Sequence, residues 1–241
     1  MDLKKCRDGV HLLCQKYEIE LGEWAVSMEN EIPVLEYLGQ RIEIPYWRYI
    51  DSYISMRNCL TDGTVLQKSM MKTTVIDTAE ISLSKMILRE TDICLWMMDD
   101  KVESVYALGN DRTATIIFRF FSGMVGTIDV ANTLASGQAP IQRYEIIGTD
   151  GVVTNKSVDE LFRQDALYCF SADGRVEGYT DFDMELYGYS IDECALVRSI
   201  LDILENQKQS AYFNEVLFRA RKIADAVFLA MEKEQKLILE D

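Results

Sequence analysis

Hydrophobic residues in this chain follow helical spacing in some stretches and alternate with polar residues in others. Three stretches predict helices: residues 81–99, 191–204 and 216–231. The first of them is apolar almost all round, which is typical of a helix enclosed by protein on most sides. Only one line of charged residues interrupts it, at Lys85, Arg89, Asp92 and Asp99. We therefore expect this helix to lie against the core.

Alternating patterns predict strands between and beside these helices. In residues 112–121, apolar residues at even positions face one way, and Thr113, Thr115 and Arg119 face the other. Ser122-Gly123 predicts a tight turn into a hairpin partner at residues 124–134, and Asp173-Gly174 predicts a second hairpin. Further strands are expected at residues 73–77, 102–108, 141–149, 152–153, 167–170, 175–179 and 237–239. Strands followed by separate helices predict the α+β class, with an open mixed or antiparallel sheet of about six strands covered on one face by helices.

The first part of the chain, residues 1–71, has weaker patterns. Residues 3–17 and 46–59 have helical spacing, and residues 41–45 alternate like a strand. Residues 32–38 predict a short helix, because Gly39 follows them as a helix C-cap would. We therefore divide the chain into a helical and extended N-terminal segment, residues 1–71, and an α/β domain, residues 72–241.

The charged line of the helix at residues 81–99 is the best candidate for a functional site. Lys85, Arg89, Asp92 and Asp99 share one face, because an α-helix repeats every 3.6 residues. Charges on such a helix must be paired, face solvent or line a cleft, since burying a lone charge costs several kcal/mol. Lys85 and Arg89 fit an anionic sugar or a carboxylate, bound through a bidentate contact. The alternative is a ladder of ion pairs between these cations and Asp92.

Composition narrows the classes of partner. The chain has 40 acidic and 25 basic residues, a net charge of −15, and its field repels nucleic acid and acidic membrane surfaces. The six cysteines form no C-x-x-C pair, and His11 is the only histidine, which argues against zinc, iron and histidine-dependent nucleophilic catalysis. We find no apolar run long enough to span a membrane and no signal peptide, so we expect a cytoplasmic protein with reduced thiols.

The order of several short motifs resembles a known family. Asp92-Ile-Cys-Leu-Trp96 is followed by residues 101–107 (KVESVYA), 115–126 (TIIFRFFSGMVG) and 144–151 (YEIIGTDG). This series, with the closing helices, resembles the second domain of the glucose–fructose oxidoreductase/inositol dehydrogenase/MocA (Gfo/Idh/MocA) family. The resemblance covers residues 72–241.

The resemblance implies a particular division of labour. Family members bind NAD or NADP in an N-terminal Rossmann domain, and a sugar or polyol in the C-terminal α/β domain, whose open sheet makes the oligomer interface. A lysine of an E-K-P motif and a histidine on the helix of the second domain assist proton transfer. Residues 1–71 would then be a linker or a Rossmann remnant.

This sequence departs from the family pattern at the catalytic positions. It has no G-x-G-x-x-G, and Gly123-Met-Val-Gly126 is a predicted hairpin. Where the family helix has an acid, a histidine and an acid, this chain has Lys85, Arg89 and Asp92, so only the last matches. If residues 39–45 correspond to the E-K-P place, Ile44 replaces its lysine; otherwise that segment is missing. Arginine stays protonated at physiological pH and cannot replace histidine as a general base.

We therefore expect a substrate-binding and oligomerisation domain for a sugar, polyol or anionic ligand that is not redox-active alone, a pseudoenzyme. Lys85, Arg89 and Asp92 are its predicted substrate-binding residues, and we assign no catalytic or metal-binding residue. We expect no cofactor for this chain alone, and NAD or NADP only if a Rossmann half is supplied elsewhere. Two alternatives remain: an assembly or regulatory subunit that pairs with itself or a homologue through the open sheet, for instance as a dimer, or one half of a split NAD(P)-dependent sugar dehydrogenase.

Overall fold

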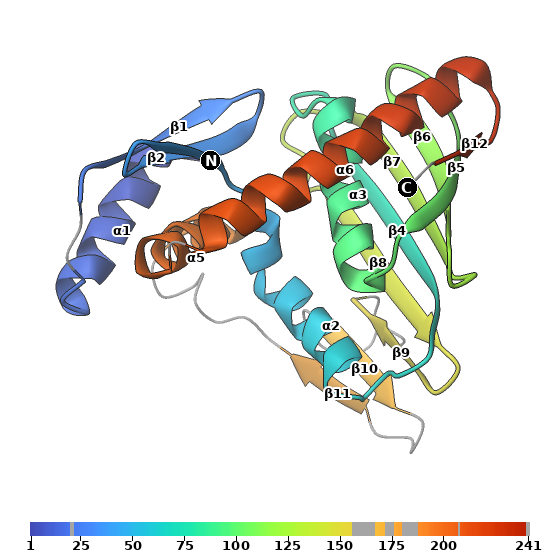
Figure 1. Ribbon diagram of the computed structural model, residues 1–241, viewed down its shortest axis with the longest axis horizontal. Helices are drawn as coiled ribbons and strands as arrows, with labels where there is room; N and C mark the ends of the chain where they lie inside the picture. The colour runs from blue at the N-terminus through green and yellow to red at the C-terminus, as the bar shows by residue number, and fades with distance from the viewer. Residues whose placement is uncertain (20–21, 156–166, 172–175, 180–187, 207, 240–241) are drawn as a thin grey trace. The chain divides into compact units, whose positions relative to one another are not determined.

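The computed structural model describes residues 1–19, 22–155, 167–171, 176–179, 188–206 and 208–239 (Figure 1). The chain forms two compact units. Unit 1 comprises Met1–Ile54 and Asp181–Arg219, and unit 2 comprises Ser55–Thr180 and Ala220–Asp241. These units are defined by compactness and do not test the domain boundary expected at residue 72, which stays a prediction.

Unit 2 is built on a nine-stranded mixed sheet with the order β11-β10-β9-β8-β4-β7-β6-β5-β12. Its strands are β4 (Lys68–Thr78), β5 (Val102–Gly109), β6 (Thr113–Phe120), β7 (Val125–Leu134), β8 (Ile141–Gly148), β9 (Gly151–Thr154), β10 (Leu167–Ser171), β11 (Val176–Tyr179) and β12 (Leu237–Ile238). Strands β4 and β7 pair in parallel, and every other pair in this sheet is antiparallel. The α+β class and the mixed sheet are thus confirmed, whereas the expected number of about six strands was too low because short strands extend both edges.

Helix α3 (Leu83–Met98) lies along one face of this sheet (Figure 1). On β6, Ile116 and Phe118 are fully buried, whereas Ile117 is 40% exposed, which confirms the predicted alternation. Gly126 on β7 lets the helix come close, because a Cβ atom there would stand 2.7 Å from the Sγ atom of Cys94. The side of the sheet that bears Ile116 and Phe118 therefore carries the core of unit 2.

The predicted hairpin between β6 and β7 is confirmed. The amide of Gly123 donates to the carbonyl of Phe120 over 2.9 Å, and Phe120 donates to the carbonyl of Met124 over 3.0 Å. Gly123 has a φ of +88°, a conformation that glycine adopts without steric cost. The second predicted turn, Asp173-Gly174, lies outside the described residues.

Unit 1 contains three helical segments, a small sheet and the first part of a long helix. These are α1 (Leu3–Lys16), β1 (Trp24–Glu29), β2 (Ile32–Tyr37), β3 (Gln40–Glu43), η1 (Tyr46–Tyr49), α5 (Ile191–Glu205) and α6 (Lys208–Lys233), whose second half belongs to unit 2; α2 (Asp51–Thr61) also begins in unit 1. The sheet β1-β2-β3 is antiparallel. The core of unit 1 contains the large side chains of Trp47, Tyr46 and Phe213, each at most 1% exposed.

The helix predicted at residues 32–38 was wrong, because this segment is strand β2. Leu38 and Gly39 both have positive φ, 50° and 73°, and form the two-residue turn of a hairpin in which Tyr37 pairs with Gln40. The glycine interpreted as a helix C-cap therefore belongs to a tight turn, for which glycine is equally typical. A similar turn at Asn30 and Glu31, also with positive φ, joins β2 to β1, which the sequence analysis missed.

Three general properties of the described residues bear on function. None of their helices combines the length and apolarity that crossing a membrane requires. They contain no group of three or more His, Cys, Asp or Glu side chains placed to hold a metal ion. All six cysteines are free thiols, and only Cys194 is not buried.

Candidate binding site on helix α3

Helix α3 is fixed at both ends. At its start, the Oγ atom of Ser82 accepts a hydrogen bond from the amide of Lys85 over 3.2 Å. At its end, the Nζ atom of Lys68 donates to the carbonyls of Met97 and Met98 over 3.1 and 2.7 Å. A cation at this place is favourable, because the carbonyl end of a helix carries partial negative charge. These contacts set the position of α3 on the sheet.

The four charged residues of the predicted line have different surroundings. Lys85 is half-buried in the first turn, Arg89 is 8% exposed and Asp92 is fully buried. Asp99 is exposed beyond the end of the helix, where its carboxylate pairs with Arg57 over 3.1 Å. The predicted line therefore separates into an inner group, Lys85, Arg89 and Asp92, and an outer ion pair at the C-cap.

A buried carboxyl group, Glu90, is the centre of the polar network under α3. The Nε atom of Arg89 donates to its Oε1 atom over 2.7 Å, and the hydroxyl of Tyr144 on β8 donates to its Oε2 atom over 3.0 Å. Glu90 is fully buried and Tyr144 is 1% exposed. The network therefore joins helix to sheet inside unit 2.

Burial dominates the electrostatics of this network. It raises the pKa of the Glu90 carboxyl, while the charge of Arg89 and the hydrogen bonds from Arg89 and Tyr144 act in the opposite direction. Burial, and then the nearby charge of Glu90, raise the pKa of the Cys94 thiol to about 12. Cys94 is therefore a neutral packing residue at physiological pH, because the thiolate is the reactive form of cysteine.

Two further hydroxyl groups belong to this buried polar region. The Oγ1 atoms of Thr91 on α3 and Thr73 on β4 are buried and make no hydrogen bond within the described residues. Thr73 lies opposite Tyr144 in the register of β4 and β8. Buried polar atoms of this kind usually have partners. The hydroxyl groups of Thr73 and Thr91 could therefore make hydrogen bonds that the described residues do not supply.

Sequence reasoning found the helix but missed Glu90 and the role of Tyr144. Glu90 follows Arg89 directly, so it lies about 100° around the helix from it and outside the line of spacing used for the prediction. Tyr144 is the first residue of the motif at residues 144–151, but that motif does not indicate that its hydroxyl is directed at α3. Glu90 could have been noticed as an acidic residue among the apolar positions on the core side of the helix.

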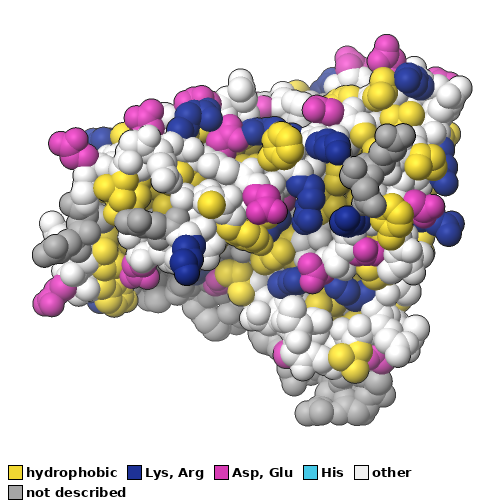
Figure 2. Space-filling view, in the orientation of Figure 1, with side chains coloured by type: hydrophobic (Ala, Val, Ile, Leu, Met, Phe, Trp, Pro, Cys, Tyr) yellow, Lys and Arg dark blue, Asp and Glu magenta, His cyan; other side chains and the backbone are white. Residues whose placement is uncertain are grey.

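Figure 2 shows several basic side chains near the middle of the face that it draws, in the region where Figure 1 draws α3, although the whole chain carries a net charge of −15. Positive charge close to α3 favours an anionic ligand over a cation. The chain's only histidine, His11, is in α1 of unit 1, where its ring lies 5.2 Å from that of Trp24. Helix α3 therefore offers fixed charges but no imidazole.

The described residues do not fit a nicotinamide dinucleotide. Such cofactors bind where parallel βαβ units bring a glycine-rich turn to the N-terminus of a helix. The sheet of unit 1 is instead an antiparallel meander, and its Gly39 lies in a hairpin turn. In unit 2, β4 and β7 are parallel, but Gly123 and Gly126 lie in and after a β-hairpin. We therefore derive no chemical step through this cofactor.

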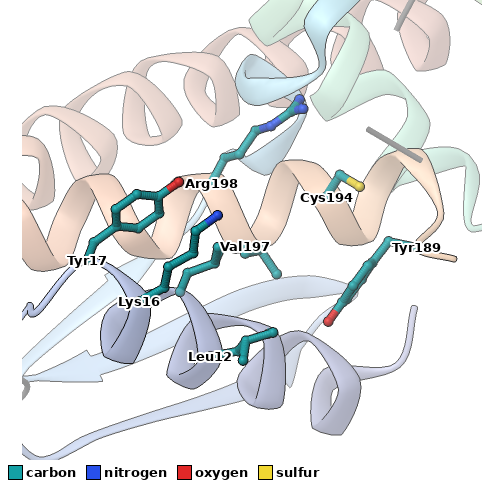
Figure 3. A pocket seen from close by; sticks show the side chains of 9 residues that line it. Leu12, Lys16, Tyr17, Tyr189, Cys194, Val197 and Arg198 are labelled. Carbon is teal, nitrogen blue, oxygen red and sulfur yellow. The ribbon is translucent and has the colours of Figure 1, made fainter. Parts of the chain in front are cut away.

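Unit 1 contains a cavity of about 270 Å³, separate from the residues predicted to bind substrate (Figure 3). Helix α1 lines it on one side, and Tyr189 and α5 line it on the other. The predicted residues Lys85, Arg89 and Asp92 belong to unit 2, so this cavity is not their binding site.

No protein-family model and no curated protein sequence matches the chain. Solved structures do match it. A "probable dehydrogenase" from Thermotoga maritima is 20% identical with a TM-score of 0.60, over 80% of this chain and 63% of that one. Levoglucosan dehydrogenase in complex with NADH and levoglucosan is 13% identical with a TM-score of 0.65, over 82% and 65%. An oxidoreductase from Agrobacterium radiobacter in complex with NAD+, L-tartaric acid and magnesium is 13% identical with a TM-score of 0.63, over 80% and 63%.

The chain has the fold of Gfo/Idh/MocA-type oxidoreductases. The expected resemblance is thereby confirmed for the fold. The chain spans less than two thirds of the length of these neighbours. Two of these structures contain a nicotinamide cofactor, together with levoglucosan in one and L-tartaric acid in the other. Whether Lys85, Arg89 and Asp92 bind a ligand in this fold stays a prediction.

Proposed function

We propose that this chain acts as the substrate-side domain of an oxidoreductase and holds a small polyol or hydroxy acid without transferring hydride by itself. The observation that carries this proposal is the chemistry of α3, where Lys85 and Arg89 supply fixed positive charge on a helix without histidine. The fold supports the class of ligand, since similar structures contain levoglucosan, L-sorbose or L-tartaric acid.

Each predicted residue has a chemical part in this proposal. Lys85 is half-buried, so its ammonium group can donate hydrogen bonds to a carboxylate or hydroxyl oxygen of the ligand. Arg89 is held by Glu90 over 2.7 Å, which fixes the orientation of its guanidinium plane. Asp92 is fully buried, and its contact with a ligand stays a prediction.

The arrangement favours binding over proton transfer. A general base must release and accept a proton near the working pH, and arginine cannot do so. Burial raises the pKa of Glu90, but both of its oxygens already accept hydrogen bonds from Arg89 and Tyr144. A nicotinamide-dependent reaction would need a dinucleotide-binding half beyond the described residues, as in the split dehydrogenase considered above.

Calorimetric titration of the purified chain with L-tartrate, levoglucosan and myo-inositol tests this proposal. We expect L-tartrate, the anionic ligand, to bind, and Lys85→Gln to weaken its binding roughly tenfold, since a hydrogen bond to a charged group contributes about 1.5–3 kcal/mol. Lys72→Gln is the matched control, because Lys72 is exposed on the opposite face of β4. Equal losses in the two variants, or no binding of any of the three ligands at millimolar concentration, would contradict the proposal.

A second candidate function is assembly through the open sheet. Leu108, Ile117 and Ile141 on β5, β6 and β8 are 45%, 40% and 37% exposed, and the register of the strands places all three on the same face of the sheet. A partner that covers this face would bury their apolar surface. In this function the sheet pairs with a copy of itself or with a homologue that contributes the missing catalytic half.

Sedimentation velocity at tens of micromolar tests the self-pairing form. We expect a dimer for the natural chain and a shift to monomer for Ile117→Lys, which places a charge on the exposed face. The control is Leu229→Lys, since Leu229 is also 40% exposed but lies on α6. A strict monomer, alone and with a full-length homologue, would exclude assembly through the sheet.

A further inference from the structure

The cavity of unit 1 lies between helices α1 and α5, whose first turns are tied together. The carboxylate of Glu193 at the start of α5 accepts hydrogen bonds from the amide of Asp2 over 2.9 Å and from the Nζ atom of Lys5 over 3.1 Å. Further along, Gly9 and Leu12 of α1 and Val197 of α5 line an opening of about 270 Å³. The two helices are therefore held together at their first turns, and the cavity lies between them further along.

Tyr189 forms one wall of this cavity. Its ring lies 4.6 Å from the Nζ atom of Lys5, and its hydroxyl donates to the carbonyl of Lys5 over 3.4 Å. Gly9 lets the ring come close to α1, because a Cβ atom there would stand 2.5 Å from the tyrosine hydroxyl. Figure 3 shows the hydroxyl of Tyr189 directed toward α1. This wall is thus fixed by several contacts.

The opposite end of the cavity carries a cation. Figure 3 shows Lys16 and Tyr17 extending from the end of α1 toward α5, with Val197 beside the lysine. Arg198 also lines the cavity, but its Nη1 atom donates to the carboxylate of Asp51 and to the carbonyl of Tyr49, so its charge is compensated there. Lys16 makes no ion pair with any described residue, and its Nζ atom lies over the ring of Tyr17 at 5.3 Å. One ammonium group therefore faces the opening.

The lining between these ends is apolar. Leu12, Leu13 and Val197 contribute it, and none of the described residues that line the cavity is acidic, although the chain contains 40 acidic residues. Leu12 and Tyr17 are 60% and 61% exposed, so their apolar surface is accessible to a ligand. An apolar surface that ends at the ammonium group of Lys16 matches a ligand with a hydrocarbon body and one anionic group.

The geometry points to a binding site for a small monocarboxylate with an apolar body, its carboxylate at Lys16 and its chain or ring along Leu12 and Val197 toward Tyr189. At about 30 Å³ for each water-sized group, the cavity accommodates a ligand of about nine such groups, the size of octanoate or 3-phenylpropanoate. This site belongs to unit 1 and does not depend on the function proposed for α3.

Calorimetric titration of the full chain with octanoate tests this site, with octanamide as the uncharged counterpart of the same length. We expect octanoate to bind with a Kd of about 0.1–1 mM, in the range usual for a ligand of this size, and octanamide to bind at least about fivefold more weakly. Lys16→Gln should weaken octanoate at least about fivefold and leave octanamide unchanged. Lys4→Gln is the matched control, because Lys4 is exposed on the same helix and does not line the cavity.

A second pair of variants tests the apolar wall without disturbing the core. Leu12→Asp places a carboxylate in the cavity and should abolish octanoate binding, whereas Leu12→Asn should weaken it less. Parallel titration with 3-phenylpropanoate distinguishes an acyl chain from an aryl body, and binding of either supports the site. Equal binding of octanoate and octanamide, equal effects of Lys16→Gln and Lys4→Gln, or no binding of either carboxylate at 5 mM would overturn it.

Discussion

At the scale of single residues, Glu90 shows how a charge is kept inside unit 2. Its carboxyl group is fully buried and receives hydrogen bonds from its neighbour on α3, Arg89, and from Tyr144 on β8. A buried ion pair contributes little net stability when intact, but removal of one partner leaves an uncompensated charge. The pair therefore makes the orientation of Arg89 costly to change, which suits a residue proposed to hold a ligand.

We expect Arg89→Met to lower the free energy of unfolding at pH 7 by about 3–5 kcal/mol, because the carboxylate of Glu90 loses its counter-ion. Urea unfolding measures this change. Arg119→Met is the control, since the Arg119 side chain is 61% exposed and its pairing with Glu103 should contribute less than about 1 kcal/mol. Equal losses in the two variants would contradict the account of the network.

The same variant has a predicted pH dependence. Burial raises the pKa of Glu90 above its usual range, and without Arg89 the opposing attraction is lost. A carboxyl whose folded pKa is raised stabilises the fold fully below its unfolded pKa, and this contribution is lost as the pH rises through the folded pKa. The destabilisation by Arg89→Met should therefore be larger at pH 8 than at pH 5.

The residues of this site could be predicted only in part. Lys85, Arg89 and Asp92 follow from helical spacing, which places them on one face whatever the tertiary structure. Their pairing could not be predicted, because Glu90 lies on another side of the helix and its partner Tyr144 is 54 residues away. Spacing reports which residues share a face, but long-range partners depend on how the sheet packs.

At the scale of elements, the junction of α1 and α5 depends on Glu193. Its carboxylate accepts hydrogen bonds from the amide of Ser190 over 3.0 Å, from the amide of Asp2 over 2.9 Å and from Lys5 over 3.1 Å. Burial raises the pKa of Glu193, but these hydrogen bonds and the charge of Lys5 outweigh it and lower the pKa to about 2. One side chain thus completes the capping box of α5 and fastens the start of α1.

Glu193→Gln should therefore lower the free energy of unfolding by about 2–3 kcal/mol at pH 7. A carboxyl with a lowered folded pKa stabilises the protein above its unfolded pKa, near 4.5, and this stability is lost as the pH falls toward 2. The difference between Glu193→Gln and the natural chain in urea unfolding should accordingly narrow from pH 5 to pH 2. Asp8→Asn, an exposed change on α1, is the control; a difference independent of pH would contradict this assignment.

Elements with strong periodicity were predictable and those defined by turns were not. Helix α3 and strand β6 were predicted within two residues because long apolar patterns fix them. Strand β2 was interpreted as a helix because Ile32–Tyr37 is short and apolar on both faces, and Gly39 suits either a C-cap or a hairpin. Asn30, Glu31 and Leu38 have positive φ angles, which are typical of hairpin turns. The sequence alone does not reveal these angles.

At the scale of the whole molecule, the two units carry different chemistry. Unit 2 has the Gfo/Idh/MocA-type sheet with charged residues on its covering helix, and unit 1 has an antiparallel sheet and an apolar cavity with one lysine. The sheet of unit 2 could be predicted from motif order, although sequence identity to similar structures is only 13–20%. The cavity could not be predicted, because it lies between segments far apart in the sequence, which are joined by a hydrogen bond between residues 188 positions apart.

We propose that this chain holds a ligand on α3 but does not bind a nicotinamide dinucleotide on its own. Calorimetric titration of the purified 241-residue chain with NADH tests it most directly. Because the sheet of unit 1 is antiparallel, we predict no binding tighter than about 1 mM, with or without L-tartrate. A Kd in the micromolar range would contradict the account.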